Sequence, residues 1–245
     1  MLFVSDVHLL TAGSARAGER ARAWGEFLDA AAARAAAGGL AALYVLGDLF
    51  DYWFEARGRI PRGFRAECER IRGAVARGLR VVVLPGNRDF LLGAAFRQAS
   101  GAETAPAGLA VVAGGLRLHL THGDALTLAD RRYQLWRRLS RGAAFARAAR
   151  GMPAAAAEVL ARVLRGGSEL EKRAKARSVM GYSQRAIEKR VAAGADAILA
   201  GHVHEPGERE VRAGTRTVKF IALGAWDAGP GAYAEFDGRT LRLVR

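Results

Sequence analysis

Five short apolar runs, each followed within a residue or two by polar residues, constrain the fold of this chain more than any other feature. The runs cover residues 2–7, 40–46, 79–84, 116–121 and 197–200. Runs of this length and composition are typical of buried strands. Residues 15–37 and 64–77 have helical periodicity and are closed by glycine, and residues 217–223, 232–236 and 240–244 are expected to form antiparallel strands. The alternation predicts an α/β sandwich with functional loops at the strand ends.

Residues 131–193 differ from the rest of the chain. They contain no strand-like run, and glycines at 142, 151, 166 and 167 interrupt segments with apolar residues at helical spacing. The segment lies between two of the predicted strands. We therefore expect a core formed by residues 1–130 and 194–245, with residues 131–193 as a helical insertion.

The net charge of +14 is concentrated in that insertion. Residues 131–190 contain 16 Lys or Arg against 4 Glu. Such a field attracts nucleic acid, anionic lipid headgroups or anionic substrates, although a solvated helical face in a chain rich in Ala and Arg would show the same charge. The single cysteine, Cys68, excludes an internal disulfide and a thiolate zinc site. With no leader-like N-terminus and no apolar run of about 18 residues, the chain is expected to be cytoplasmic.

The polar residues after the five runs are of the types that bind metal ions. The motifs are Asp6-Val7-His8, Gly47-Asp48, Gly86-Asn87-Arg88-Asp89, His122-Gly123-Asp124 and Gly201-His202-Val203-His204. Four of the five histidines lie in them, and only His119 lies inside a strand. One histidine alone is more often an ordinary half-buried side chain, but four together with two aspartates and an asparagine favour a metal site. Such a mixed N/O set suits Mn²⁺, Fe, Co or Zn better than Ca²⁺ or Mg²⁺.

In this order, the five motifs resemble those of the calcineurin-like metallophosphoesterase superfamily along the whole chain. The resemblance implies a four-layer α/β/β/α sandwich with two divalent metal ions, most simply Mn²⁺, at the strand ends. One ion would be held by Asp6, His8, Asp48 and His204, and the other by Asp48, Asn87, His122 and His202, with Asp48 bridging. A water shared by both ions would lose a proton easily and attack phosphorus. Asp48, Asn87, Arg88 and His202 would be the catalytic residues.

Arg88 departs from the pattern of many members, which have histidine at this position. Arginine cannot act as a general acid near neutral pH, but its planar guanidinium binds phosphate oxygens in pairs. A phosphate leaving group needs less protonation than an alkoxide. The substitution therefore favours cleavage of a diphosphate.

Four segments, residues 47–50, 86–93, 122–134 and 223–226, resemble the UDP-2,3-diacylglucosamine pyrophosphatases of the lipid A pathway. This implies hydrolysis of a lipid-linked nucleotide to UMP and 2,3-diacylglucosamine 1-phosphate, with the insertion as a lid over the acyl chains. Residues 51–55 depart from the acidic run of that family, and some members have Asn in place of Lys172. The implied substrate-binding residues are Asn87, Arg88, Phe90, Asp130, Tyr133, Ser168, Lys172, Lys175 and His202.

The basic lid is also expected to lie on an anionic surface, the inner membrane of a Gram-negative bacterium, with Trp136, Leu139 and Phe145 as apolar contacts. These three side chains could instead pack within the lid. Another nucleotide pyrophosphatase is the nearest alternative. A nuclease is disfavoured by Arg88 and by the lack of a stacking platform, and a non-enzymatic scaffold by the presence of all seven ligands. No nucleic acid and no obligate protein partner is expected.

Overall fold

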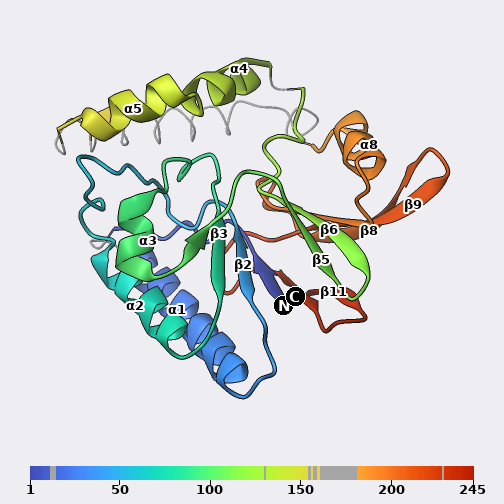
Figure 1. The fold of residues 1–245 in the computed structure, drawn as a ribbon, viewed down its shortest axis with the longest axis horizontal. Coiled ribbons are helices and arrows are strands. Elements are labelled where there is room, and N and C mark those ends of the chain that lie inside the picture. The colour runs from blue at the N-terminus through green and yellow to red at the C-terminus, as the bar shows by residue number, and fades with distance from the viewer. Residues whose placement is uncertain (12–14, 130, 154–155, 157–158, 161–180, 228) are drawn as a thin grey trace.

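The computed structural model describes residues 1–11, 15–129, 131–153, 156, 159–160, 181–227 and 229–245 (Figure 1). They form two β-sheets. The first has the strand order β11-β10-β1-β2-β3-β4 and the second β5-β6-β7-β9-β8. The strands of the first sheet are β1 (Leu2–Val4), β2 (Leu43–Leu46), β3 (Val81–Leu84), β4 (Glu103–Thr104), β10 (Tyr233–Phe236) and β11 (Leu241–Val244). Those of the second are β5 (Leu109–Ala113), β6 (Leu116–Thr121), β7 (Ala197–Ala200), β8 (Gly207–Ala213) and β9 (Arg216–Ala222).

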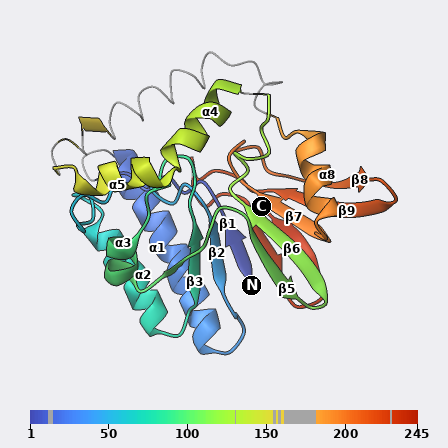
Figure 2. The same cartoon turned by 45° about the horizontal axis from the view of Figure 1, so that its top comes forward.

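The helices lie on the outer faces and across one end of the sandwich. The first sheet is covered by α1 (Ala15–Ala36), α2 (Arg65–Ala76) and α3 (Ala94–Ser100), and the second by α8 (Gln184–Ala192). Across the end lie α4 (Arg131–Ser140) and α5 (Ala143–Gly151), as Figures 1 and 2 show. No helix within the described ranges combines the length and apolar character needed to cross a bilayer.

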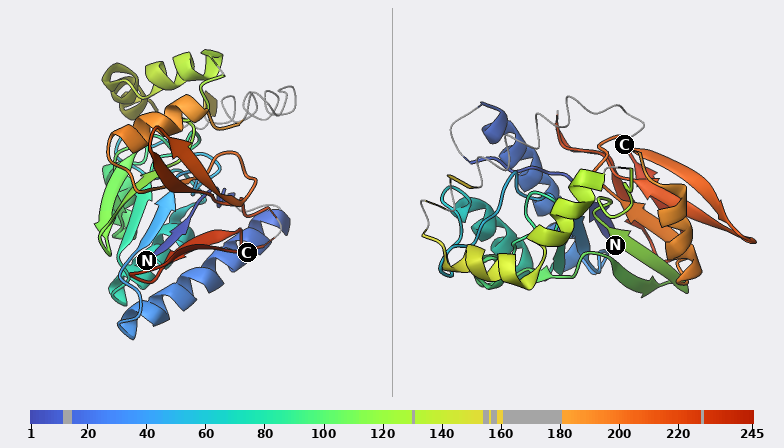
Figure 3. Two further views of the ribbon diagram at one scale, coloured as in Figure 1. Left: turned by 90° about the vertical axis from the view of Figure 1, so that its right-hand side faces the viewer. Right: turned by 90° about the horizontal axis from the view of Figure 1, so that it is seen from above.

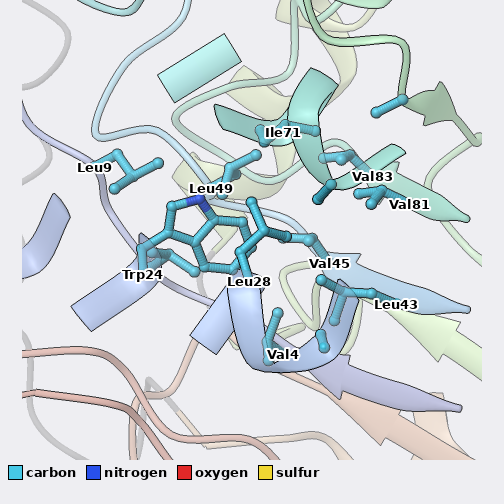
Figure 4. Packing of buried hydrophobic residues seen from close by; sticks show 14 of the residues in the cluster. Val4, Leu9, Trp24, Leu28, Leu43, Val45, Leu49, Ile71, Val81 and Val83 are labelled. Atoms are coloured by element: carbon cyan, nitrogen blue, oxygen red, sulfur yellow. The ribbon is translucent and has the colours of Figure 1, made fainter. Parts of the chain in front are cut away.

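Side chains that point alternately to the two faces of each strand produce the layers of the sandwich. In β2, Leu43 and Val45 pack toward the helices, whereas Tyr44 and Leu46 pack toward the second sheet. The helix-facing cluster also includes Trp24, Leu28 and Ile71 (Figure 4). A further cluster joins α8 to the second sheet. Figure 3 shows the resulting order of helix, sheet, sheet and helix, which confirms the predicted α/β sandwich.

The observed elements match most of the predicted ones. The predicted strand over residues 2–7 ends at Val4, and those over 40–46 and 79–84 begin later, at Leu43 and Val81. No strand was predicted for β4, β5 or β8, and no helix for α3. Helix α8 falls within the predicted insertion but packs on the second sheet through Ile187 and Val191. The boundary of the insertion stays a prediction.

Candidate metal centre

The candidate ligands lie in five loops that begin where parallel strands end. Strands β1, β2 and β3 are parallel neighbours, as are β6 and β7. The Asp6 N–H donates to Gly47 O at 3.1 Å, and the Gly201 N–H donates to His122 O at 2.8 Å. The two sheets meet where the His202 N–H donates to Asp6 Oδ2 at 2.8 Å. All five loops therefore lie at one edge of the sandwich.

Several of these residues have backbone conformations that side chains other than glycine rarely adopt. Among the described residues, six that are not glycine have a positive φ, and five of them are candidate ligands with φ between 51° and 77°: Asp6, His8, Asp48, His202 and His204. Strain of this kind persists only where the surrounding structure holds it, and it clusters at functional sites. The strained backbone conformations therefore occur at the same residues as the potential metal ligands.

Asp89 links the loop after β2 to the loop after β3 through hydrogen bonds. Its buried carboxylate accepts hydrogen bonds from the N–H groups of Gly86, Asp48 and Leu49, at 2.7, 3.2 and 2.8 Å. Burial and the nearby charge of Asp48 raise the pKa of Asp89 to about 7. Gly47, with a φ of +88°, allows the close approach, because a Cβ there would lie 2.7 Å from Gly86 Cα. No role was predicted for Asp89, and its only signal in the sequence is its place in the motif at residues 86–89.

Asp6, His8 and His204 form a first group of metal-binding atoms. His204 Nε2 lies 3.2 Å and His8 Nε2 3.7 Å from Asp6 Oδ1, and the two nitrogens are 3.2 Å apart. Burial alone would raise the pKa of Asp6, but the hydrogen bond from His204 and the charge of His122 hold it well below its usual value. The carboxylate is therefore ionised, as a metal ligand must be.

Asn87, His122 and His202 form a second group. Asn87 Oδ1 lies 2.8 Å from His122 Nε2 and 2.9 Å from His202 Nδ1. Asp48 lies between the two groups, with Oδ2 3.8 Å from His8 Nδ1 and Oδ1 3.7 Å from His122 Nε2. One potential ligand atom from each of Asp48, His122 and Asp6 lies within 4.8 Å of the others, so the two groups are contiguous.

The chemistry of these atoms fits bound cations. Asp48 Oδ2 is buried and accepts no hydrogen bond from any described residue. His122 Nδ1 lies 3.0 Å from Leu46 O. A carbonyl oxygen can only accept a hydrogen bond, so in the neutral ring Nδ1 carries the proton. The lone pair of Nε2 then points at the oxygen of Asn87. Burial would lower the pKa of His122, but the charges of Asp48 and Asp6 raise it. The centre is thus strongly negative and suits divalent ions with mixed N/O ligands.

Arg88 reaches the centre from the loop after β3. Its N–H donates to Asp48 Oδ1 at 2.9 Å, and its guanidinium pairs with Asp51 while Nε lies 3.9 Å from Asp48 Oδ2. The side chain is 9 % exposed. Asp51, to which the sequence assigned no role, orients a fixed positive charge beside the ligands. Its only sequence signal is its position three residues after Asp48.

The predicted substrate-binding residues are only partly described. Tyr133 is half-buried, donates to Asp124 Oδ2 at 2.9 Å and stacks on His202 with ring centroids 5.9 Å apart. Phe90 lies against Phe145, with centroids 6.1 Å apart. Asn87, Arg88 and His202 lie in the centre described above. The remaining four predicted residues lie outside the described residues: Asp130, Ser168, Lys172 and Lys175.

A family model described as calcineurin-like phosphoesterase matches residues 1–206. The chain belongs to this family. This phosphoesterase is therefore a metal-dependent hydrolase, and its two groups of potential ligands indicate a dimetal centre.

Curated relatives of this phosphoesterase match over nearly its whole length. UDP-2,3-diacylglucosamine hydrolase of Chromobacterium violaceum is 34% identical over 244 residues, which cover 99% of this chain and 97% of the relative. That of Pseudomonas aeruginosa is 32% identical, covering 93% and 91%. Solved structures include an archaeal phosphodiesterase, 13% identical with a TM-score of 0.46 and coverages of 99% and 97%. The phosphoesterase Yfce from E. coli is 18% identical, with a TM-score of 0.44 and coverages of 95% and 85%.

Proposed function

We propose that this phosphoesterase hydrolyses the diphosphate of UDP-2,3-diacylglucosamine to UMP and 2,3-diacylglucosamine 1-phosphate, a step of lipid A biosynthesis. The observation that carries the reaction type is the convergence of seven potential ligands from five strand-end loops. The substrate is supported by relatives of that name at 31–34% identity. Arg88, beside the ligands where many members of the superfamily have histidine, supports a diphosphate substrate.

In this proposal the two groups each hold one cation. Asp6, His8 and His204 would hold one ion, Asn87, His122 and His202 would hold the other, and Asp48 would contribute to both. Two divalent cations, Mn²⁺ first among them, supply a water of lowered pKa and neutralise charge on the phosphoryl oxygens.

The side chains around the centre orient the substrate. Arg88, held by Asp51, binds phosphoryl oxygens through its guanidinium. Asn87 and His202 also contact the phosphate. Phe90 and Tyr133 bind the substrate from the edge of the centre, together with Asp130, Ser168, Lys172 and Lys175.

Mass spectrometry of the products tests this proposal. Purified protein with Mn²⁺ and UDP-2,3-diacylglucosamine in heavy-oxygen water is expected to give UMP carrying the heavy oxygen. Asp48→Asn is expected to abolish product, whereas Asp29→Asn, at a side chain 61 % exposed, serves as the matched control. Heavy oxygen on the lipid phosphate, or no product from the wild type, would contradict the proposal.

A second substrate separates this function from that of another nucleotide pyrophosphatase. An unacylated UDP-sugar lacks the chains that a lid would cover, so we expect its kcat/KM to be lower by at least about 100-fold, in line with the loss of buried methylene groups. Equal values for both substrates would indicate a general nucleotide pyrophosphatase.

We also propose that the enzyme works in the cytoplasm at the inner membrane of a Gram-negative bacterium. Helix α4 exposes Leu135 and Leu139, which are 59% and 61% exposed, beside the exposed Arg138. A basic residue near an anionic surface contributes about 1 kcal/mol. Arg138→Gln is therefore expected to weaken sedimentation with phosphatidylglycerol vesicles about fivefold. Arg185→Gln, at an exposed residue of α8, is the control. Equal binding of the wild type and both variants would contradict docking through α4.

A further inference from the structure

Asp124 is a buried carboxylate to which helix α4 is tied. It follows His122 by two residues, and its side chain is 1 % exposed. Three side chains donate to Oδ2: Tyr133 Oη at 2.9 Å and Arg137 Nε at 3.0 Å from α4, and Arg141 Nη2 at 2.6 Å from the residue directly after α4. The backbone oxygen accepts from Gln134 Nε2 of α4 at 2.7 Å and from Thr127 Oγ1 at 3.1 Å. One residue thus receives donors spread over most of the helix.

The same helix reaches the loops of two further candidate ligands. Arg141 Nη2 also donates at 3.0 Å to Gly86 O, directly before Asn87. The ring of Tyr133 stacks on His202 with an interplanar angle of 28°. Asp124 itself belongs to the loop of His122. Helix α4, together with Arg141 directly after it, therefore contacts each of the three loops that form the second group.

The charged side chains of Asp124, Arg137 and Arg141 are well placed to set the position of α4. The Asp124 carboxylate is paired with two guanidinium groups, Arg137 Nε at 3.0 Å and Arg141 Nη2 at 2.6 Å. Removing one partner of a buried charge pair leaves the other uncompensated. Two large apolar side chains of the helix, Leu135 and Leu139, are exposed and cannot anchor it to the core.

The arginines at the end of α4 and directly after it fall into two kinds, those that bind Asp124 and one that faces solvent. Arg137 and Arg141 are 22 % and 18 % exposed and bind Asp124, whereas Arg138 is exposed. The first two arginines thus face inward, toward the centre.

We propose that Asp124 is a positioning residue which, through Arg137, Arg141 and Tyr133, couples α4 to the second group of ligands and keeps it in the geometry that retains a cation. The inference rests on the proposed metal centre. It gives the helix a role in metal binding that is separate from covering a substrate.

Metal binding to the intact chain tests this inference without any substrate. Metal-stripped protein is titrated with Mn²⁺ by equilibrium dialysis, and we expect the wild type to bind two ions. Asp124→Asn and Arg141→Gln are each expected to weaken one of the two ions by about 10- to 100-fold, as loss of a supporting residue does elsewhere, and to leave the other unchanged. Arg138→Gln is the matched control, with wild-type binding, and Arg141→Lys is expected to recover part of the loss.

The outcomes separate the two proposals. A wild type that binds fewer than two ions contradicts the dimetal centre. A wild type that binds two, with Asp124→Asn and Arg141→Gln binding both ions at wild-type affinity, contradicts the positioning role even if both variants unfold at lower temperature. Should Asp124→Asn not fold, Arg141→Gln and Arg137→Gln decide the question.

Discussion

The sandwich and helix α4 place their functional side chains in different ways. In the sandwich, ligands follow strands whose other residues are buried in continuous apolar clusters: Trp24, Phe50 and Leu28 are at most 1% exposed. In α4, Leu135 and Leu139 are about 60% exposed, and the helix is tied to the sandwich by polar contacts of Tyr133 and Arg137 with Asp124 and by stacking of Tyr133 on His202. Backbone pairing positions the first set, and side-chain charges position the second.

The difference has a consequence for mutation. In the sandwich, the backbone hydrogen bonds and apolar contacts that stabilise the fold also set the positions of the ligands. In α4 a few polar groups set the position of the helix while contributing little buried apolar area. Substitutions in the sandwich should therefore change stability and activity together, whereas those in α4 should change function with a smaller loss of stability.

Apart from the loss of activity expected for Asp48→Asn, the largest effect is expected at Asp6, which belongs to the first group of potential ligands and also lies close to the rest of the centre. Asp6 lies within 4.8 Å of ligand atoms of His8 and His204 and also of Asp48 and His122. Asp6→Asn removes the charge without changing the shape, so kcat/KM should fall on the order of 10³-fold or more, and bound Mn²⁺ should fall with it. Steady-state kinetics and metal analysis check this. A variant that keeps two ions and loses less than tenfold would remove Asp6 from the centre.

A pair of leucines tests the difference in stability. Leu28 is 1% exposed in the cluster of Figure 4, and Leu139 is 61% exposed on α4. Leu28→Ala is expected to lower the free energy of unfolding by about 2–5 kcal/mol, and Leu139→Ala by no more than about 0.5 kcal/mol. Urea denaturation measures both. Equal losses would show that α4 is packed as tightly as the sandwich.

Asp51 tests whether the sandwich also contains residues that act by orienting a charge. Asp51→Asn leaves the guanidinium of Arg88 with a weaker partner beside Asp48. Removing one partner of a buried hydrogen bond costs about 1–3 kcal/mol, so kcat/KM should fall by about 10- to 100-fold while bound metal stays at the wild-type level. Loss of metal instead would make Asp51 part of the ligand scaffold.

Much of the fold and of the centre could be predicted because both depend on short patterns in the sequence. Runs such as residues 43–46 are buried on both faces, so they stand out as apolar, and the polar residue that follows each run marks the edge where parallel strands end. The gathering of the seven predicted ligands at one edge follows from that rule. Strand β8 was missed because it has no apolar run: Glu208, Arg209, Glu210 and Arg212 are charged and exposed, and Val211 is buried between them.

Contacts between distant polar residues could not be predicted in this way. The pairing of Asp51 with Arg88 and of Asp124 with Arg141 depends on how loops and a helix are placed in space, and no periodicity encodes it. The sequence analysis treated the basic residues of 131–190 together, as one charged region. The structure separates them, because a buried carboxylate binds only those on the inner side.

The smallest effect is expected at His119, the histidine outside the centre. It lies in β6, and burial, together with the charge of Arg190 on α8, lowers its pKa from 6.5 to about 4. The unfolded chain therefore binds a proton that the folded chain does not, and this contribution to stability is lost as the pH falls from about 6.5 to about 4. Because the ring is only partly buried, we expect about 1–2 kcal/mol.

His119→Gln removes this titration while the other four histidines remain. The difference in unfolding free energy between wild type and variant, measured by urea denaturation at pH 7 and at pH 4.5, should change by that amount, with the wild type losing more in acid. The other four histidines are present in both proteins, so their effect cancels in the difference. An unchanged difference would mean that His119 is protonated as readily in the folded chain as in the unfolded one.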